Sequence, residues 1–157
     1  MGKWSREELE EAFDRYQRVA LECGPAKSWD AFVDLFTEDC VYVDYPRGVI
    51  GGREALRRHY DGLFTTFPHD YLWYYPVEWY MVDEERGWIS CLFYLRMADP
   101  GDGSLHQVPC FGLLKYAGNG LWKCEEDMYD VNALLAMFER WTVAKRRCDA
   151  EAAKREE

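Results

Sequence analysis

Apolar side chains in the first 67 residues recur about every 3.6 positions, which is the period of an amphipathic helix. The pattern predicts helices over residues 5–22, 29–36 and 52–67, with a strand over residues 40–45 between the last two. Gly24-Pro25 is expected to end the first helix and Pro68 the third, because proline cannot continue the hydrogen bonding of a helix.

After Asp70 apolar positions alternate with polar ones, which indicates β-strands. Strand candidates cover residues 71–82, 88–98, 105–116 and 121–130, and short turns rich in Gly, Asp and Asn separate them. Turns this short join antiparallel neighbours, whereas Pro76 and Pro109 inside two of the strands mark edges or bulges that bend a sheet. A final helix is expected over residues 132–147.

This order of elements predicts an α+β fold, in which the N-terminal helices pack in the concave face of a bent mixed or antiparallel sheet. We expect one domain over residues 1–148 and a charged, frayed tail over residues 149–157. The strand over residues 71–82 carries aromatic side chains on both faces. We therefore expect its outer face to pack against a second copy of the chain in a homodimer.

The net charge of −10 argues against nucleic acid or an anionic membrane as a partner, because both require a basic surface. No apolar run approaches the ~18 residues of a membrane span, and nothing resembles a signal peptide, so a soluble cytoplasmic protein is expected. The six cysteines contain no C-x-x-C pair, which favours buried thiols over disulfides or a zinc site. We expect neither a metal nor a cofactor.

Asp44 closes an apolar strand, where a carboxylate packs poorly and is costly to bury without a partner. It is either a turn residue that hydrogen-bonds nearby backbone, as Pro46 suggests, or a carboxylate that faces a cavity. Asp127 shares one strand face with Glu125 and Tyr129. A structural role for Asp127, capping a turn or pairing with Arg53, is as compatible with the sequence as a catalytic one.

Three stretches of the chain resemble the SnoaL-like branch of the nuclear transport factor 2-like superfamily. They are Leu35-Phe36-Thr37-Glu38-Asp39 with Val41-Tyr42-Val43-Asp44, Gly52-Arg53-Glu54-Ala55-Leu56, and residues 116–122 leading to Glu126-Asp127-Met128-Tyr129. The resemblance implies a cone-shaped fold with a pocket between the helices and the sheet. The superfamily includes isomerases, dehydratases, epoxide hydrolases, polyketide cyclases and proteins without catalysis, so fold does not decide function.

Ketosteroid isomerase, one such relative, places its general base at Asp44 and its oxyanion-hole tyrosine at Tyr16. Its second oxyanion donor would fall near residues 110–112, where this chain has no carboxyl group. Limonene epoxide hydrolase is similar over residues 42–56 and places its water-holding residues at Tyr42 and Asp44 and its base at Asp127.

Scytalone dehydratase is similar at two positions, with a tyrosine at Tyr45 and a histidine at His69. Its other histidine falls at Phe93, which cannot transfer protons. One residue of the Arg-Asp pair of limonene epoxide hydrolase also falls at Phe93. No single relative matches at every position.

The resemblance implies a pocket that binds a small, hydrophobic and cyclic molecule. The catalytic candidates are Asp44, Tyr16, Asp127 and His69, and the expected walls are Tyr42, Tyr45, Phe93, Tyr129 and Trp29. The first hypothesis is a cofactor-independent isomerase, dehydratase, cyclase or hydrolase, with Asp44 as general base and Tyr16 as hydrogen-bond donor. The alternative is a non-catalytic module of the same fold that binds a small ligand or a partner.

Overall fold

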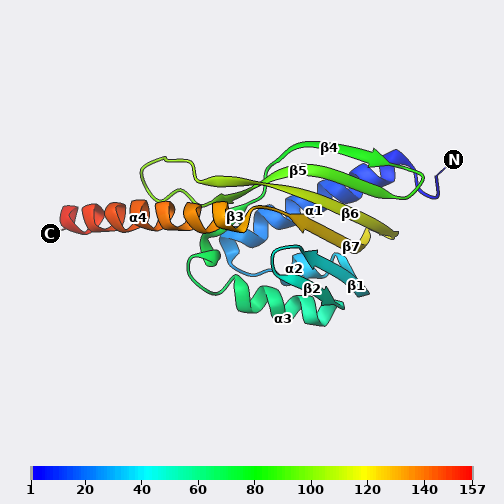
Figure 1. Cartoon of the computed structure of the whole chain (residues 1–157), viewed down its shortest axis with the longest axis horizontal. Coiled ribbons are helices and arrows are strands. Elements are labelled where there is room, and N and C mark those ends of the chain that lie inside the picture. The colour runs from blue at the N-terminus through cyan, green and yellow to red at the C-terminus, as the bar shows by residue number, and fades with distance from the viewer. Residues whose placement is uncertain (1, 157) are drawn as a thin grey trace.

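The computed structural model describes residues 2–156, and its long N-terminal helix lies along one face of a curled sheet (Figure 1). The α-helices are α1 (Arg6–Ala26), α2 (Asp30–Val33), α3 (Arg53–Leu63) and α4 (Val131–Arg155), and a 3₁₀ turn covers His69–Tyr71. The strands are β1 (Phe36–Asp44), β2 (Gly48–Gly51), β3 (Leu72–Tyr74), β4 (Val77–Asp83), β5 (Trp88–Met97), β6 (Gln107–Gly118) and β7 (Leu121–Met128).

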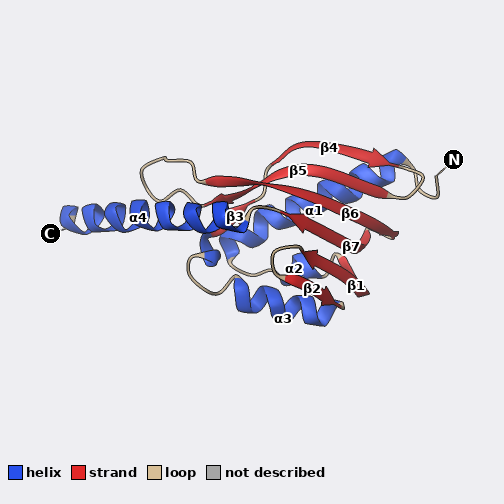
Figure 2. Cartoon of the chain, in the orientation of Figure 1, coloured by secondary structure: helices blue, strands red, loops and turns tan. Residues whose placement is uncertain are grey.

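The strands form one mixed sheet in the order β2-β1-β7-β6-β5-β3, and β4 also pairs with β5. Strand β1 runs parallel to β7, and the other neighbouring pairs are antiparallel. Figure 2 shows α1 lying along one face of this sheet, with α2 and α3 near its β1–β2 end. The predicted α+β cone with helices in the concave face of a bent mixed sheet is confirmed.

The predicted helix over residues 29–36 was too long. Only Asp30–Val33 is helical, because Phe36 already pairs with Trp122 of β7 as the first residue of β1. The pairing of β1 with β7 shifts register between Phe36 and Val41, so the residues between them do not follow a regular ladder. A simple alternation pattern in the sequence does not reveal such a shift. The loop expected after β1 contains the short strand β2.

The predicted strand over residues 71–82 is two strands, β3 and β4, separated at Pro76, which has no N–H for a ladder bond. Helix α1 extends slightly past Pro25, and α4 extends to Arg155. The tail expected to be frayed is therefore helical up to Arg155, and Figure 1 shows α4 projecting beyond the sheet. Its last turns are rich in alanine, glutamate and lysine, which favour helix without tertiary contacts.

Aromatic side chains dominate the core, and Trp122, Trp141, Tyr116 and Phe13 are its largest fully buried members. The cysteines are free thiols, and all but Cys148 are buried. Within the described part of the chain, none of the helices has the length and apolar character needed to cross a bilayer.

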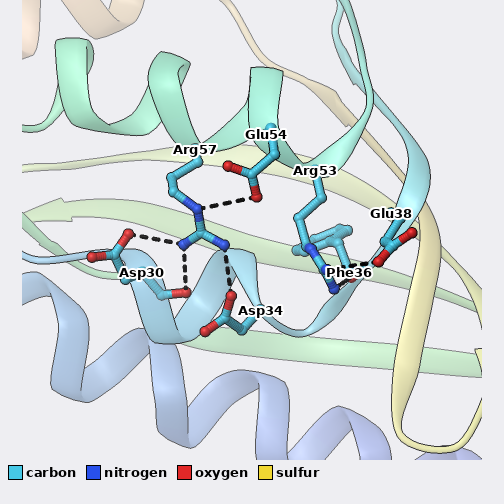
Figure 3. A network of polar contacts seen from close by, with 7 residues as sticks. All are labelled: Asp30, Asp34, Phe36, Glu38, Arg53, Glu54 and Arg57. Atoms are coloured by element: carbon cyan, nitrogen blue, oxygen red, sulfur yellow. Dashed lines mark hydrogen bonds and ion pairs between the residues drawn. The ribbon is translucent and has the colours of Figure 1, made fainter.

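Arginines of α3 tie this helix to α2 and to the start of β1 (Figure 3). Arg57 contacts Asp30 at 2.8 Å and Asp34 at 2.6 Å, both on the α2 segment. Arg53 contacts Glu38 at 3.5 Å and donates a hydrogen bond to the carbonyl of Phe36. These contacts fix α3 against α2 and β1, beside the cavity described below, which α3 helps to line.

Replacing Arg57 by alanine should lower the free energy of unfolding by about 1 kcal/mol, because several partly exposed ion pairs on one guanidinium are lost together. Urea unfolding followed by circular dichroism measures this change. Arg86→Ala, which removes a single ion pair between neighbours in an exposed turn, is the matched control and should have a smaller effect. Equal effects would contradict a special role for the α3 clamp.

The outer face of the sheet exposes Trp79, Met81, Phe111 and Met128, and the rings of Trp79 and Phe111 are 6.0 Å apart. We expect this face to form the interface of a homodimer, because a monomer would leave these apolar side chains in water. Light scattering at micromolar concentration should give twice the chain mass of 18.6 kDa. Phe111→Glu should shift the mass to the monomer value, whereas Val143→Glu on exposed α4 should not.

Candidate functional site

A cavity lies between the concave face of the sheet and helices α1, α2 and α3. It holds about 840 Å³ of space not filled by atoms, counted out to its opening to solvent. Most of its wall is aromatic, with contributions from Tyr16 of α1, Tyr60 and Phe64 of α3, and Tyr75 and Phe93 of the β-sheet region. An aromatic wall of this kind suits a small ligand with an apolar body.

Two neighbouring strands place the polar groups of the cavity. Strand alternation directs Glu125, Asp127 and Tyr129 of the β7 segment inward, together with Tyr42 and Asp44 of β1. The parallel pairing sets Tyr42 beside Glu125 and Asp44 beside Asp127. Three carboxyl groups therefore lie close together on one wall, because both strands present the same face in the same register.

The two deep carboxyl groups are held by tyrosines. Tyr16 donates a hydrogen bond of 2.7 Å to Oε1 of Glu125, and Tyr42 donates one of 2.6 Å to Oδ2 of Asp127. Tyr60 approaches the hydroxyl of Tyr42 at 3.3 Å. Glu125 is 3% exposed and Asp127 is 7% exposed, and Oε2 of the first and Oδ1 of the second have no hydrogen-bond partner among the described residues.

Burial raises the pKa of both deep carboxyl groups. The pKa of Asp127 rises to about 7, and the pKa of Glu125 rises well above its ordinary value, also because Asp127 is nearby. Interaction between the two carboxyl groups raises the pKa of Glu125 and lowers that of Asp127, which makes Glu125 the protonated partner. The pair thus retains one proton near neutral pH and carries one negative charge.

Asp44 is 8% exposed and lies nearer the opening. Tyr129 donates to both of its carboxylate oxygens, at 2.9 and 3.1 Å, and Nε of Arg47 is 3.9 Å away. Burial raises the pKa of Asp44, whereas the contacts with Tyr129 and Arg47 oppose the rise. The net direction is the one expected for a carboxylate that faces a cavity, not for one that only caps a turn.

Two histidines and Arg47 surround the opening. Nη2 of Arg47 lies 2.9 Å from Nε2 of His69, so it can donate a hydrogen bond to an unprotonated ring nitrogen. Burial, and then Arg47, lower the pKa of His69 to about 4 and also lower the pKa of His59. His69 is consequently neutral at pH 7 and holds the guanidinium in place, instead of supplying protons.

Of the residues expected at the pocket, Trp29, Phe93, Tyr42 and Tyr129 line the cavity. Tyr45 does not, because it follows the inward Asp44 and must point to the other face of the strand. It is 54% exposed and bonds Glu126 at 2.8 Å on the outer face.

The suggested pairing of Asp127 with Arg53 is wrong, because Arg53 contacts Glu38 and Phe36 instead. Sequence reasoning gave no role to Glu125, Arg47 or Tyr60, all of which line the cavity. The alternation of β7 could have identified Glu125, because it shares a face with Asp127. The positions of Arg47 and Tyr60 depend on tertiary packing and carry no such signal.

Gly112 pairs with Asp127 across β6 and β7. A Cβ atom at Gly112 would lie 2.8 Å from Phe93 and 3.5 Å from Oδ1 of Asp127, so the glycine leaves room for both side chains. The sequence near residues 110–112 lacked the carboxyl group expected by analogy with ketosteroid isomerase. In the structure the neighbouring strand β7 places a carboxyl group beside that position.

Residues 12–122 match the family model of the SnoaL-like domain. The chain belongs to the SnoaL-like family. No curated protein matches the sequence of this SnoaL-like chain significantly.

Several solved structures share the fold at low sequence identity. The epoxide hydrolase/cyclase-like enzyme SalBIII, which has a role in pyran ring formation in the polyether salinomycin, matches with a TM-score of 0.63 and 16% identity over 82% of this chain and 95% of that chain. A Jannaschia sp. CCS1 protein assigned to the SnoaL-like polyketide cyclases matches with a TM-score of 0.61 and 18% sequence identity. The match covers 88% of this chain and 97% of that chain. An NTF2-like protein from Anabaena variabilis matches with a TM-score of 0.59 and 11% sequence identity. The match covers 83% of this chain and 95% of that chain.

The polar groups of this SnoaL-like cavity do not suit a metal ion. Among residues 2–156, no three His, Cys, Asp or Glu side chains are grouped so that they could hold one. Cys91 and Cys110 also line the cavity, and burial raises the pKa of both thiols, so neither is a nucleophile at neutral pH. The carboxyl groups with raised pKa values are therefore the groups of this cavity that can exchange a proton near neutral pH.

Replacing Asp127 by asparagine should make stability less dependent on pH. The folded-state pKa of about 7 lies above the ordinary value of 3.8, so the folded protein loses stability as pH rises between these values, and the loss is complete above pH 7. As pH rises from 5 to 8, the free energy of unfolding should fall in both proteins. The fall should be smaller in the variant than in the parent protein by at least about 1 kcal/mol. Urea unfolding at the two pH values measures this, and exposed Glu78→Gln should behave like the parent. Identical pH profiles for parent and Asp127→Asn would contradict the raised pKa.

Proposed function

We propose that this SnoaL-like protein is a cofactor-independent acid/base enzyme that acts on a small hydrophobic molecule, with Asp44 as its general base. One observation carries the proposal: three buried carboxyl groups share one aromatic cavity, and burial raises the pKa of each of them. Carboxyl groups whose pKa values are moved toward neutral pH are typical of acid and base roles in one site.

Asp44 suits the role of base because its surroundings keep the ionised form accessible. Tyr129 donates to both of its oxygens, and Arg47 lies 3.9 Å away, so both contacts favour the carboxylate. Burial acts in the opposite direction and makes this carboxylate more basic than one in water. Its place near the opening also lets a substrate reach it from solvent.

The Glu125–Asp127 pair suits the role of acid because it retains a proton. Tyr16 holds Glu125, and Tyr42 holds Asp127, so both carboxyl groups keep a fixed orientation. A protonated carboxyl group can donate to an oxygen that gains negative charge during the reaction. Tyr16 then acts through Glu125, as a positioning residue.

The relatives support the same class of chemistry without naming the substrate. SalBIII is described as an epoxide hydrolase/cyclase-like enzyme, and the Jannaschia protein is assigned to polyketide cyclases. A cyclic substrate would lie in the cavity against the rings that line it, among them Trp29, Tyr60 and Phe93. The alternative function, a binding module without catalysis, is favoured by the same aromatic wall and differs only in whether Asp44 transfers protons.

Deuterium exchange separates these functions, because incorporation from D₂O into a small cyclic ketone, followed by NMR, reports proton transfer directly. Asp44→Asn keeps the shape of the side chain and removes the base, so exchange should fall by about 10²-fold while ligand binding persists. Asp83→Asn, in an exposed turn, is the matched control and should retain the rate of the parent protein. Undiminished exchange in Asp44→Asn would refute Asp44 as the base, and absence of exchange in the parent protein would favour the binding module.

A further inference from the structure

The residues that line the cavity carry an excess of negative charge. Asp44, Glu125 and Asp127 face it, and Arg47 is the one permanently charged cation among the described lining residues. His59 and His69 are neutral at pH 7 because burial and Arg47 lower their pKa values. Arg47 lies beside Asp44, so the deep pair has no cation of its own.

Two oxygens of the deep pair receive no hydrogen bond from another donor residue. Oε2 of Glu125 and Oδ1 of Asp127 are buried, and no separate donor among residues 2–156 reaches them. The one proton that the pair retains can bridge the two groups, but it leaves one negative charge uncompensated. Buried polar groups without partners are rare in folded proteins, and inside a cavity they are completed by water, an ion or a ligand.

The cavity wall above this pair is made of aromatic rings. Trp29 stacks on Phe64 with ring centroids 4.7 Å apart and meets Tyr75 edge-on at 5.5 Å. Tyr75 in turn lies 6.4 Å from Phe93. Ring faces carry partial negative charge and attract organic cations, most strongly where water is excluded.

We propose that the cavity takes an organic cation, a small amine with an apolar cyclic body, whose ammonium group binds the Glu125–Asp127 pair. The inference rests on the cavity described under the proposed function and keeps Asp44 as its base, but it gives the deep pair the role of binding the ammonium group instead of donating a proton to an oxygen. The ammonium N–H groups donate to the oxygen atoms that no other residue reaches and neutralise the remaining charge, and the aromatic wall encloses the apolar body. A neutral alcohol of the same shape offers only one donor and no charge, and a carboxylate is repelled.

Binding of an ammonium group is linked to the proton of the pair. The acidic neighbours of Asp127 are Glu125 on its own strand, which is protonated, and Asp44 on β1, beside which Arg47 lies. The tyrosines and thiols from the other elements are neutral because burial raises their pKa values. An added cation favours the ionised form of Asp127. Affinity should therefore rise as pH increases through about 7, the pKa of Asp127, as long as the amine stays protonated.

Calorimetric titration with benzylamine, benzyl alcohol and benzoate tests the proposal on the intact protein without any assay of turnover. At pH 8 benzylamine should bind at least about 10-fold more tightly than benzyl alcohol, and benzoate should bind more weakly than either. Benzylamine should also bind more tightly at pH 8 than at pH 5.5. Equal affinity for amine and alcohol, or preference for benzoate, would overturn the proposal.

A variant locates the binding group. Asp127→Asn should abolish the preference for the amine over the alcohol, whereas Glu78→Gln on the outer face should keep it. If Asp127→Asn kept the full preference for benzylamine over benzyl alcohol, the deep pair would be refuted as the site. If this variant does not fold, the titrations of the parent protein alone decide the ligand class. Asp44→Asn should still bind benzylamine. Failure of the deuterium exchange assay would thus leave the amine site standing, and failure of the titration would leave the base role of Asp44 untouched.

Discussion

The parallel pairing of β1 with β7 is the constraint on which the site depends. It joins the first strand of the chain to the last, and it aligns Tyr42 with Glu125 and Asp44 with Asp127 on the concave face. Three carboxyl groups on an inner face would be costly if that face packed against a solid core. The curled sheet and the helices leave a cavity there instead, so the same pairing that closes the fold also concentrates its titratable groups.

The carboxyl groups are tolerated because each layer of the fold contributes a donor. Tyr16 comes from α1, Tyr42 from β1 and Tyr129 from the segment after β7, and each donates to one of the three groups. The hydroxyl groups remain neutral because burial raises their pKa values, so they can donate hydrogen bonds without adding charge. A change in the placement of α1 would therefore alter the site as well as the core.

The fold could be predicted from the sequence because its signals are local. The change in hydrophobic period near residue 70 and the turns between the later strands specify helices first and antiparallel strands afterwards. The parallel β1–β7 pair has no local signal, since about 80 residues separate its partners. The sequence pattern therefore allowed a mixed sheet but did not identify this pair.

The same distinction explains which site residues sequence reasoning identified. Asp44, Asp127 and Tyr42 lie on strands whose alternation fixes their direction, whereas Tyr45 was misplaced because that alternation was not applied to it. Arg47 reaches the opening only because the turn between β1 and β2 brings it to His69, a contact between residues of separate loops. Residues on strands can thus be assigned to a wall from sequence, but the charge balance of the cavity depends on turns and helices whose packing the sequence does not state. That balance separates a site for a neutral molecule from one for a cation, which is why the ligand class had to be inferred from the assembled structure.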